Sequence, residues 1–390
     1  MRRKYLAGPI LCSLACWTFG NGIAPLLPLY AVERGASRAA SGLFFAFAFL
    51  CLALGTFAAA ILPKAFAHRK PLLVTSGVLL GVLSWLQGNA ANVLQLAATT
   101  GPAWFLAGIV FSQSATLVGL AAKPEDRGAA FGIYGMTSGL GSLIGGFGVG
   151  YIADRFGYRS VFASLAVVFV LVVVGGLVSI EPPAAPSLDS RGRPGIGRGK
   201  VGIVFVLLLV AELFAAVANA AGVLGRSLAM DAGGFGKLAI TLTASIAGLV
   251  SLGFPALLGW LSDRVGRRWI MVVSYAATCA GLLVLVFARS MWQFCAFAVL
   301  NAFLNVAWAV GPAYILDIVP KEGVDRGVSL FQTLYWFGNV AGMACAGFAF
   351  ATLGLAIPLF IASLFPATGA VLLLFAREKT RRAENAGGLP

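Results

Sequence analysis

The feature that most constrains this chain is a series of long apolar blocks separated by breaks rich in Arg, Lys, Pro or Gly. Examples are 161–180, 201–210 and 356–376. A helix of about 20 apolar residues matches the hydrocarbon thickness of a bilayer. Only 11% of the residues are charged, whereas a soluble domain has about 25%. The chain is therefore predicted to be an all-α membrane protein, and a soluble fold is excluded.

Division at the charged and Pro/Gly breaks predicts twelve transmembrane helices. The first six are expected at 7–30, 38–62, 71–89, 93–121, 128–153 and 160–180. The second six are expected at 201–225, 237–261, 269–288, 292–319, 328–353 and 356–376. The basic start resembles a signal peptide but lacks a small-x-small cleavage site, so we interpret 7–30 as a retained first span.

The basic residues predict the orientation of these spans. If the N-terminus is cytoplasmic, all but seven of the 28 Lys and Arg residues fall in cytoplasmic segments. The seven exceptions are Arg34, Arg38, Arg155, Arg159, Arg226, Lys237 and Arg289. Because short cytoplasmic loops carry the excess of basic residues, both termini are expected on the cytoplasmic side of an inner (plasma) membrane. The net charge of +14 is thereby dispersed along an anionic lipid surface, which argues against a nucleic-acid partner.

Landmarks of the first half recur in the second half at an offset of 198 or 199 residues. The matching landmarks are Asn21 with Asn219, Arg69-Lys70 with Arg267-Arg268, and Asp126-Arg127-Gly128 with Asp325-Arg326-Gly327. The segment 181–200 is rich in Pro, Gly and Arg and is typical of a flexible linker. We therefore expect a six-helix bundle at 1–180, a cytoplasmic linker at 181–200, and a second six-helix bundle with a short tail at 201–390.

The loop between the eighth and ninth spans, GWLSDRVGRR (259–268), resembles the G-x-x-x-D-R-x-G-R-R signature of the major facilitator superfamily. The segments KPEDRG (123–128), YIADRFGYRSVF (151–162) and PKEGVDRG (320–327) are also similar to loops of that family. The resemblance covers essentially the whole chain. It implies two pseudo-symmetric bundles that rock about a central cavity, and transport by alternating access.

The resemblance also implies a gating role for this loop. Asp263 is expected at the N-terminal end of the fifth span, where free backbone N–H groups favour an anion. We call this predicted contact the Asp263 clasp; it would stabilise the outward-open state. The expected gating residues are Gly259, Asp263, Arg264, Gly266, Arg267, Arg268, Asp126 and Arg127.

Each of these gating residues has an expected local role. Gly259 should allow close packing and Gly266 a tight turn, while the arginines would hold lipid headgroups or carboxylates such as Asp126. Arg267 and Arg268 could equally serve only to set the topology.

The sequence departs from the family pattern at three places. The first-half copy of the loop, ILPKAFAHRK (61–70), has Ala65 in place of the Asp, so its clasp is expected to be missing. Trp104 stands where many proton-coupled relatives carry an Arg. GSLIGG (141–146) is similar to the G-P-x-x-G-G motif of drug exporters, but with Ser142 in place of Pro. The exporter signature is therefore partial.

Glu212 is the only acidic residue expected deep in a span, twelve residues after Lys200 and so roughly 18 Å along a helix. Ionisable groups within the membrane are costly and usually functional. Glu212, Asn219 and Arg226 are seven residues apart, so they share one helix face. We expect Glu212 to carry a coupling proton or to bind a cationic substrate group. The alternative is a neutral carboxyl group held by a neighbouring helix.

Other spans also carry polar or aromatic residues at helical spacing. The complete set expected along the substrate and proton pathway is Glu212, Asn219, Asn21, Tyr134, Asn301, Asn305, Trp308, Gln332, Trp336 and Asn339. Such residues suit a cavity for an amphipathic organic molecule, although each alone could be a contact between helices.

These features favour a monomeric exporter of lipophilic, drug-like compounds coupled to protons. An importer or facilitator of a neutral metabolite such as a sugar, and a non-transporting membrane sensor, remain alternatives. The six cysteines lie in apolar blocks without metal-ligand spacing. The sequence also lacks the phosphate-binding loop of an ATP-driven pump and any catalytic constellation. No cofactor, metal ion or enzymatic activity is expected.

Overall fold

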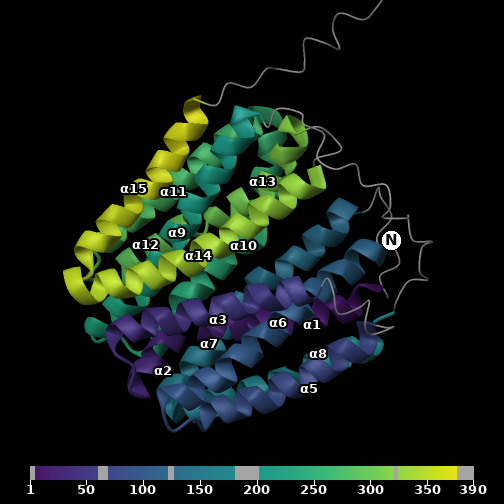
Figure 1. Ribbon diagram of the computed structural model, residues 1–390, viewed down its shortest axis with the longest axis vertical. Coiled ribbons are helices and arrows are strands. Elements are labelled where there is room, and N and C mark those ends of the chain that lie inside the picture. Colours follow the sequence, from purple (N-terminus) through teal and green to yellow (C-terminus); the bar gives the residue numbers. More distant parts are fainter. Residues whose placement is uncertain (1–4, 60–68, 122–126, 181–201, 320–323, 376–390) are drawn as a thin grey trace, which may run out of the picture.

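The computed structural model describes residues 5–59, 69–121, 127–180, 202–319 and 324–375, and these residues are helical with short connections (Figure 1). The first half contains α1 (Ala7–Ile23), α2 (Leu27–Glu33), α3 (Arg38–Ala58), α5 (Arg69–Gly88), α6 (Val93–Ala121), α7 (Arg127–Val168) and α8 (Val170–Val178). The second half contains α9 (Ile203–Ala232), α10 (Lys237–Val265), α11 (Arg267–Val286), α12 (Met291–Asn301), α13 (Leu304–Ile318), α14 (Val324–Leu353) and α15 (Ala356–Phe375). The predicted linker at 181–200 and the tail lie outside the described residues.

Within the described ranges, ten helical segments are long and apolar enough to cross a membrane, or eleven if the bent pair α1–α2 is one span. The bend of 54° follows Ile23, where Pro25 removes a backbone donor. One segment, 133–178, has 46 residues and would extend about 69 Å as a helix, roughly twice the hydrocarbon thickness. Gly157 divides it, with non-helical φ 75° and ψ 176°. The structure is therefore consistent with the twelve predicted spans.

The end of the seventh span differs from the prediction. Arg226 was expected just beyond residue 225, but α9 continues to Ala232 and ends at Gly233-Gly234. Gly234 adopts φ 76°, the left-handed conformation that commonly ends a helix. A charged residue was the wrong marker of this boundary, because the Gly-Gly pair is what stops the helix. Arg226 consequently lies inside the bundle.

The helices form two bundles (Figure 1), with α1–α8 in purple and blue and α9–α15 in teal, green and yellow. Within the first bundle α7 packs on α1 and α5, and α3 packs on α6. Within the second, α9 packs on α14 and α15, and α11 packs on α15. The bundles contact each other mainly through α7 with α10 and through α3 with α14. The helical bundle fold expected from the sequence is confirmed.

Small residues allow the two bundles to approach closely, as is common between membrane helices. A Cβ added to Gly42 of α3 would lie 2.5 Å from the Cα of Gly347 of α14. On the other side, a Cβ added to Gly146 of α7 would overlap Ser245 of α10, and the Ser142 hydroxyl donates to the Ala244 carbonyl at 2.9 Å. The GSLIGG segment thus lies at the contact between the bundles.

These close contacts lie toward one end of the molecule. Glu33, Asp154 and Lys237 are at this end, which we call the Asp154 face; the opposite end, with Arg264, Arg267 and Arg268, is the Arg264 face. Gly42 is close to the start of α3 and Gly347 is close to the end of α14, so both lie toward the Asp154 face. The two bundles are therefore closed against each other at the Asp154 face.

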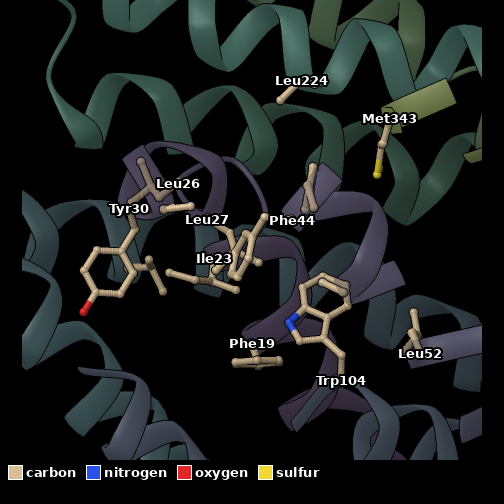
Figure 2. Close-up of a cluster of buried hydrophobic side chains, with 14 of the residues drawn as sticks. Phe19, Ile23, Leu26, Leu27, Tyr30, Phe44, Leu52, Trp104, Leu224 and Met343 are labelled. Atoms are coloured by element: carbon tan, nitrogen blue, oxygen red, sulfur yellow. The ribbon is translucent and has the colours of Figure 1, made fainter. Parts of the chain in front are cut away.

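The core continues across this closed end. One cluster of buried side chains includes Phe19, Ile23 and Phe44 of the first bundle together with Leu224 and Met343 of the second. Figure 2 shows these residues between α1, α3, α9 and α14. A second cluster, which includes Tyr275, Tyr314 and Phe331, contains residues of the second bundle alone.

Candidate functional site

Three asparagines from three helices of the second bundle form one hydrogen-bonded cluster. The Asn219 side-chain amide (α9) donates to Asn339 Oδ1 (α14) at 2.9 Å, and the Asn301 amide (α12) donates to Asn219 Oδ1 at 2.9 Å. The Asn339 amide donates in turn to the Tyr335 carbonyl at 2.9 Å. Asn301 Oδ1 is buried without a partner among the described residues. The structure thus brings together three of the residues selected from the sequence, which we call the asparagine cluster.

Glu212 lies two helical turns from Asn219 and is fully buried. Its Oε2 accepts a hydrogen bond of 2.7 Å from the Tyr275 hydroxyl of α11, which is also fully buried. Its Oε1 has no partner in the described part of the chain. Tyr275 was not selected from the sequence, because nothing in its apolar span distinguishes it from a packing residue. The carboxyl group therefore has one neutral donor and no described cation beside it.

An aromatic row joins the two bundles beside this region. The rings of Phe49 (α3) and Trp336 (α14) have centroids 6.2 Å apart, and those of Phe49 and Trp104 (α6) are 5.0 Å apart. Trp104 is buried, and its Nε1 has no hydrogen-bond partner among the described residues. The sequence pointed to Trp336 but missed Phe49, which is one Phe among 29. An aromatic surface with an unused donor suits an amphipathic molecule.

The other predicted pathway residues make local contacts. The Tyr134 hydroxyl donates to the Phe111 carbonyl at 3.3 Å, and the Asn305 amide donates to Ser251 at 2.8 Å, away from the asparagine cluster. Asn21 is partly exposed on α1 and Gln332 is exposed on α14. The side chain of Trp308 lies outside the described residues. For these five positions a place in the pathway remains a prediction.

The arginines of the 259–268 loop bind within their own bundle. The Arg264 guanidinium lies 3.9 Å from the centre of the Trp260 ring. Arg267 pairs with Asp317 of α13 at 3.1 Å, and Arg268 donates to the Leu374 carbonyl of α15. Gly266 has φ 101°, as the expected tight turn requires.

One expectation for this loop is wrong in this conformation. No described atom lies within 4 Å of a Cβ added at Gly259, so α10 does not pack closely there. Arg267 holds a carboxylate as expected, that of Asp317, and a contact of the arginines with Asp126 stays a prediction. The Asp126, Arg127 and Asp263 side chains lie outside the described residues, and the Asp263 clasp stays a prediction.

At the opposite face, a contact that the sequence interpretation missed joins the two bundles. Both carboxylate oxygens of Asp154, at the end of α7 before Gly157, accept backbone hydrogen bonds from the first turn of α10. The Lys237 N–H binds Oδ1 at 2.7 Å and the Leu238 N–H binds Oδ2 at 2.9 Å. A carboxylate at a helix N-terminus satisfies free N–H groups and interacts favourably with the helix dipole. We call this contact the Asp154 clasp.

A second layer of interactions surrounds the Asp154 clasp. The Lys237 ammonium pairs with Glu33 of α2 at 3.1 Å and lies 4.1 Å from the centre of the Tyr158 ring. Lys237 belongs to the second bundle, whereas Glu33 and Tyr158 belong to the first. The Asp154 face is thus closed by polar contacts between the bundles as well as by apolar packing.

A sequence signal for the Asp154 clasp was present. Gly150, Asp154, Arg155, Gly157 and Arg159 have the same spacing as Gly259, Asp263, Arg264, Gly266 and Arg268. Both second glycines, Gly157 and Gly266, adopt positive φ. The pattern therefore occurs once at each face of the molecule, and we had assigned Asp154 only to a loop.

The Major Facilitator Superfamily model matches residues 10–232 and 204–389. The chain belongs to the major facilitator superfamily. Multidrug resistance protein MdtG of Escherichia fergusonii is 26% identical over 353 residues, which cover 85% of this chain and 85% of that protein. The MdtG proteins of Serratia proteamaculans and Proteus mirabilis are 27% and 26% identical, and each match covers at least 84% of both chains.

Two solved structures have the same fold as this chain. The crystal structure of a bacterial homolog of the human lysosomal transporter Spinster, in an inward-facing and occupied conformation, has a TM-score of 0.73 at 17% identity. A structure of a bacterial Spinster homolog in an inward-facing and unoccupied conformation has a TM-score of 0.74 at 15% identity. Each covers 96% of both chains. The resemblance seen in the 259–268 loop is therefore confirmed over the whole chain.

Proposed function

We propose that this transporter exports lipophilic, drug-like organic molecules in exchange for protons. The observation that carries the proposal is the single face of α9 that presents the buried Glu212 and, two turns away, the asparagine cluster. A proton-binding group and a substrate-binding group on one rigid helix are coupled because movement of either repositions the other. The MdtG relatives, named for multidrug resistance, support export as the direction.

We assign to Glu212 the binding of the coupling proton. We do not assign to it the binding of a cationic group of the substrate. It is fully buried behind Tyr275, so a bulky organic cation has no direct approach to it. Ionising a carboxyl group in an apolar environment is costly unless a partner stabilises the charge. Rearrangement of the Tyr275 hydrogen bond would therefore accompany gain or loss of a proton.

We propose that the aromatic row binds the apolar part of the substrate. Phe49 and Trp104 belong to the first bundle and Trp336 to the second, so a molecule lying against them contacts both moving parts. Asn219, Asn301 and Asn339 supply amide donors and acceptors on one side of it. Broad acceptance of lipophilic compounds follows from contacts that are mostly apolar and aromatic.

We propose that alternating access consists of opening one face of the molecule while the other face closes. The Asp154 face is closed in this structure by the Asp154 clasp and by glycine contacts. With both termini assigned to the cytoplasm, this face is the outer one, and we assign the described state to the inward-open end of the cycle. Export then requires the Asp154 clasp to break and the bundles to close at the Arg264 face, where the Asp263 clasp would form.

The test is transport in reconstituted vesicles with an imposed pH gradient and Nile red, an uncharged lipophilic fluorophore, as the substrate. The wild-type chain should move Nile red against its gradient, and Glu212→Gln should lose the dependence on the pH gradient. Asp231→Asn is the matched control, because Asp231 is an exposed carboxylate on the same helix. Normal pH-driven transport by Glu212→Gln would refute the assignment of the proton to this residue.

A facilitator of neutral metabolites is the second candidate, and the asparagine cluster favours it because amide groups bind sugar hydroxyls well. In the same vesicles this activity would appear as downhill movement of a labelled sugar, insensitive to the pH gradient and unchanged in Glu212→Gln.

A further inference from the structure

The longer α9 places a positive charge inside the second bundle. Arg226 is only 5% exposed, and it precedes the last turns of a helix that ends at Ala232. A basic side chain at the end of a span normally extends to the interface and keeps its charged group in water. Arg226 does not do so, because the protein itself covers it.

No described group offsets this charge. Arg226 Nε is buried without a hydrogen-bond partner in the described part of the chain. The ion pairs recorded between described residues involve other cations, Lys237 with Glu33 and Arg267 with Asp317. An arginine stays protonated in proteins, and a buried charge without a partner is strongly unfavourable. This position is therefore suited to an anion supplied from outside the chain.

The surroundings of Arg226 indicate what kind of anion fits. Asn219 lies seven residues earlier on the same helix face, and side chains of a helix lean toward its N-terminus, so the guanidinium is directed toward the asparagine cluster. That cluster contains a second unsatisfied buried atom, Asn301 Oδ1. A guanidinium donor on the same helix face as an amide cluster, two turns away, matches an anionic molecule that also carries a hydrogen-bond donor. Phe49 and Trp336, the partly exposed members of the aromatic row, offer an apolar surface for the remainder of the molecule.

We propose that Arg226 is the anion-binding residue of the substrate site and that it binds the carboxylate, sulfonate or phosphate group of an amphipathic organic molecule. The assignment to substrate rests on the proposed transport function, whereas binding itself can be measured without transport. It extends the substrate class from lipophilic compounds to amphiphiles with one anionic group. Glu212, about 21 Å away along α9, keeps the separate role of carrying the proton.

The experiment is a thermal-stability titration of the full chain in a neutral detergent, with 1-naphthoate as the probe and its methyl ester as the uncharged equivalent. Wild type should be stabilised by 1-naphthoate and much less by the ester. Arg226→Met keeps the side-chain length without the charge and should weaken 1-naphthoate binding roughly tenfold to a hundredfold, the usual range for a lost charge-assisted hydrogen bond. Arg226→Lys should restore part of the affinity.

Two further measurements separate binding from structure. Arg289→Met removes an exposed arginine at the end of the same bundle and should bind 1-naphthoate as wild type does. Without ligand, Arg226→Met should melt no lower than wild type, because it removes an uncompensated buried charge.

Three outcomes would overturn the proposal. These are equal stabilisation by naphthoate and its ester, unchanged naphthoate binding in Arg226→Met, and stabilisation by phosphatidylglycerol but not by naphthoate, which would indicate a lipid site. Because each outcome is read from binding, it leaves the test of Nile red export independent.

Discussion

The segments 150–159 and 259–268 share five residues at the same spacing, yet they make different kinds of contact. At the Asp154 face the carboxylate binds the first turn of α10 in the other bundle. At the Arg264 face the described basic residues, Arg264, Arg267 and Arg268, bind Trp260, Asp317 and Leu374 of their own bundle. The described contacts of the first segment therefore join the bundles, whereas those of the second segment stay within one bundle.

The shared spacing of Gly, Asp and Arg residues therefore does not by itself hold the bundles together. What matters is whether a helix N-terminus of the opposite bundle is within reach of the Asp. If the two clasps exclude each other, the pattern at each face stabilises one end state of the transport cycle.

Gly42→Val should disrupt closure of the Asp154 face most strongly. The added Cβ would lie 2.5 Å from the Cα of Gly347, so the helices must move apart, at a cost of about 1–3 kcal/mol. Spin labels at Asn89 and Ala232, which lie in different bundles at this face, should report a longer distance. Gly20→Val is the control, because no described atom lies within 4 Å of a Cβ at Gly20. An unchanged distance in Gly42→Val would contradict the closed arrangement.

Asp154→Ala should have the next largest effect. It removes two hydrogen bonds to the start of α10, and loss of such a cap typically costs about 1 kcal/mol and up to 2. The same pair of spin labels should show an open population increased roughly fivefold to thirtyfold. Asp154→Asn, which keeps an acceptor but no charge, should lie between Ala and wild type. If Asp154→Ala behaves as wild type, the contact is a consequence of closure and does not stabilise it.

Glu33→Gln should have a smaller effect in the same direction. The side chains of Lys237 and Glu33 are 30% and 49% exposed, and exposed ion pairs contribute about 0–1 kcal/mol. We expect at most a fewfold increase in the open population at low ionic strength, with no difference from wild type at 1 M salt. An effect equal to that of Asp154→Ala at high salt would show that Glu33, rather than the helix cap, closes this face.

Asp263→Ala should change the population of the described state least. The predicted Asp263 clasp stabilises the opposite state, so its loss should favour an arrangement that is already closed at the Asp154 face. The expected observation is an unchanged label distance but a slower passage into the opposite state, measured as slower transport. A longer distance at the Asp154 face would mean that the two clasps act together rather than in turn.

The parts of the fold that could be predicted depend on short-range regularities. Apolar blocks set the spans, and the seven-residue spacing of Asn219 from Glu212 correctly placed an amide group on a helix face that meets Asn301 and Asn339. Helix periodicity selects the face, and the shortage of polar partners in an apolar bundle brings such faces together.

The missed parts depend on neighbours far apart in the chain. Tyr275 and Phe49 are ordinary members of apolar spans, and only the packing of α11 and α3 gives them a role. Arg226 was misplaced because a charge was taken as a span boundary, whereas Gly233-Gly234 ends the helix. The Asp154 clasp could have been found by comparing 150–159 with 259–268, but its partner on α10 could not, because capping depends on the closed arrangement of the bundles.

The glycine-rich turn of α7 has a mechanical consequence. Gly145 lies against α1 of its own bundle and Gly146 against α10 of the other, so one helical turn contacts both surfaces without long side chains. Surfaces of this kind do not interlock, and sliding across them requires no change of rotamer. The barrier to rocking should therefore come from separating the shared apolar core and breaking the hydrogen bonds and ion pairs between the bundles, and not from interlocked side chains at this turn of α7.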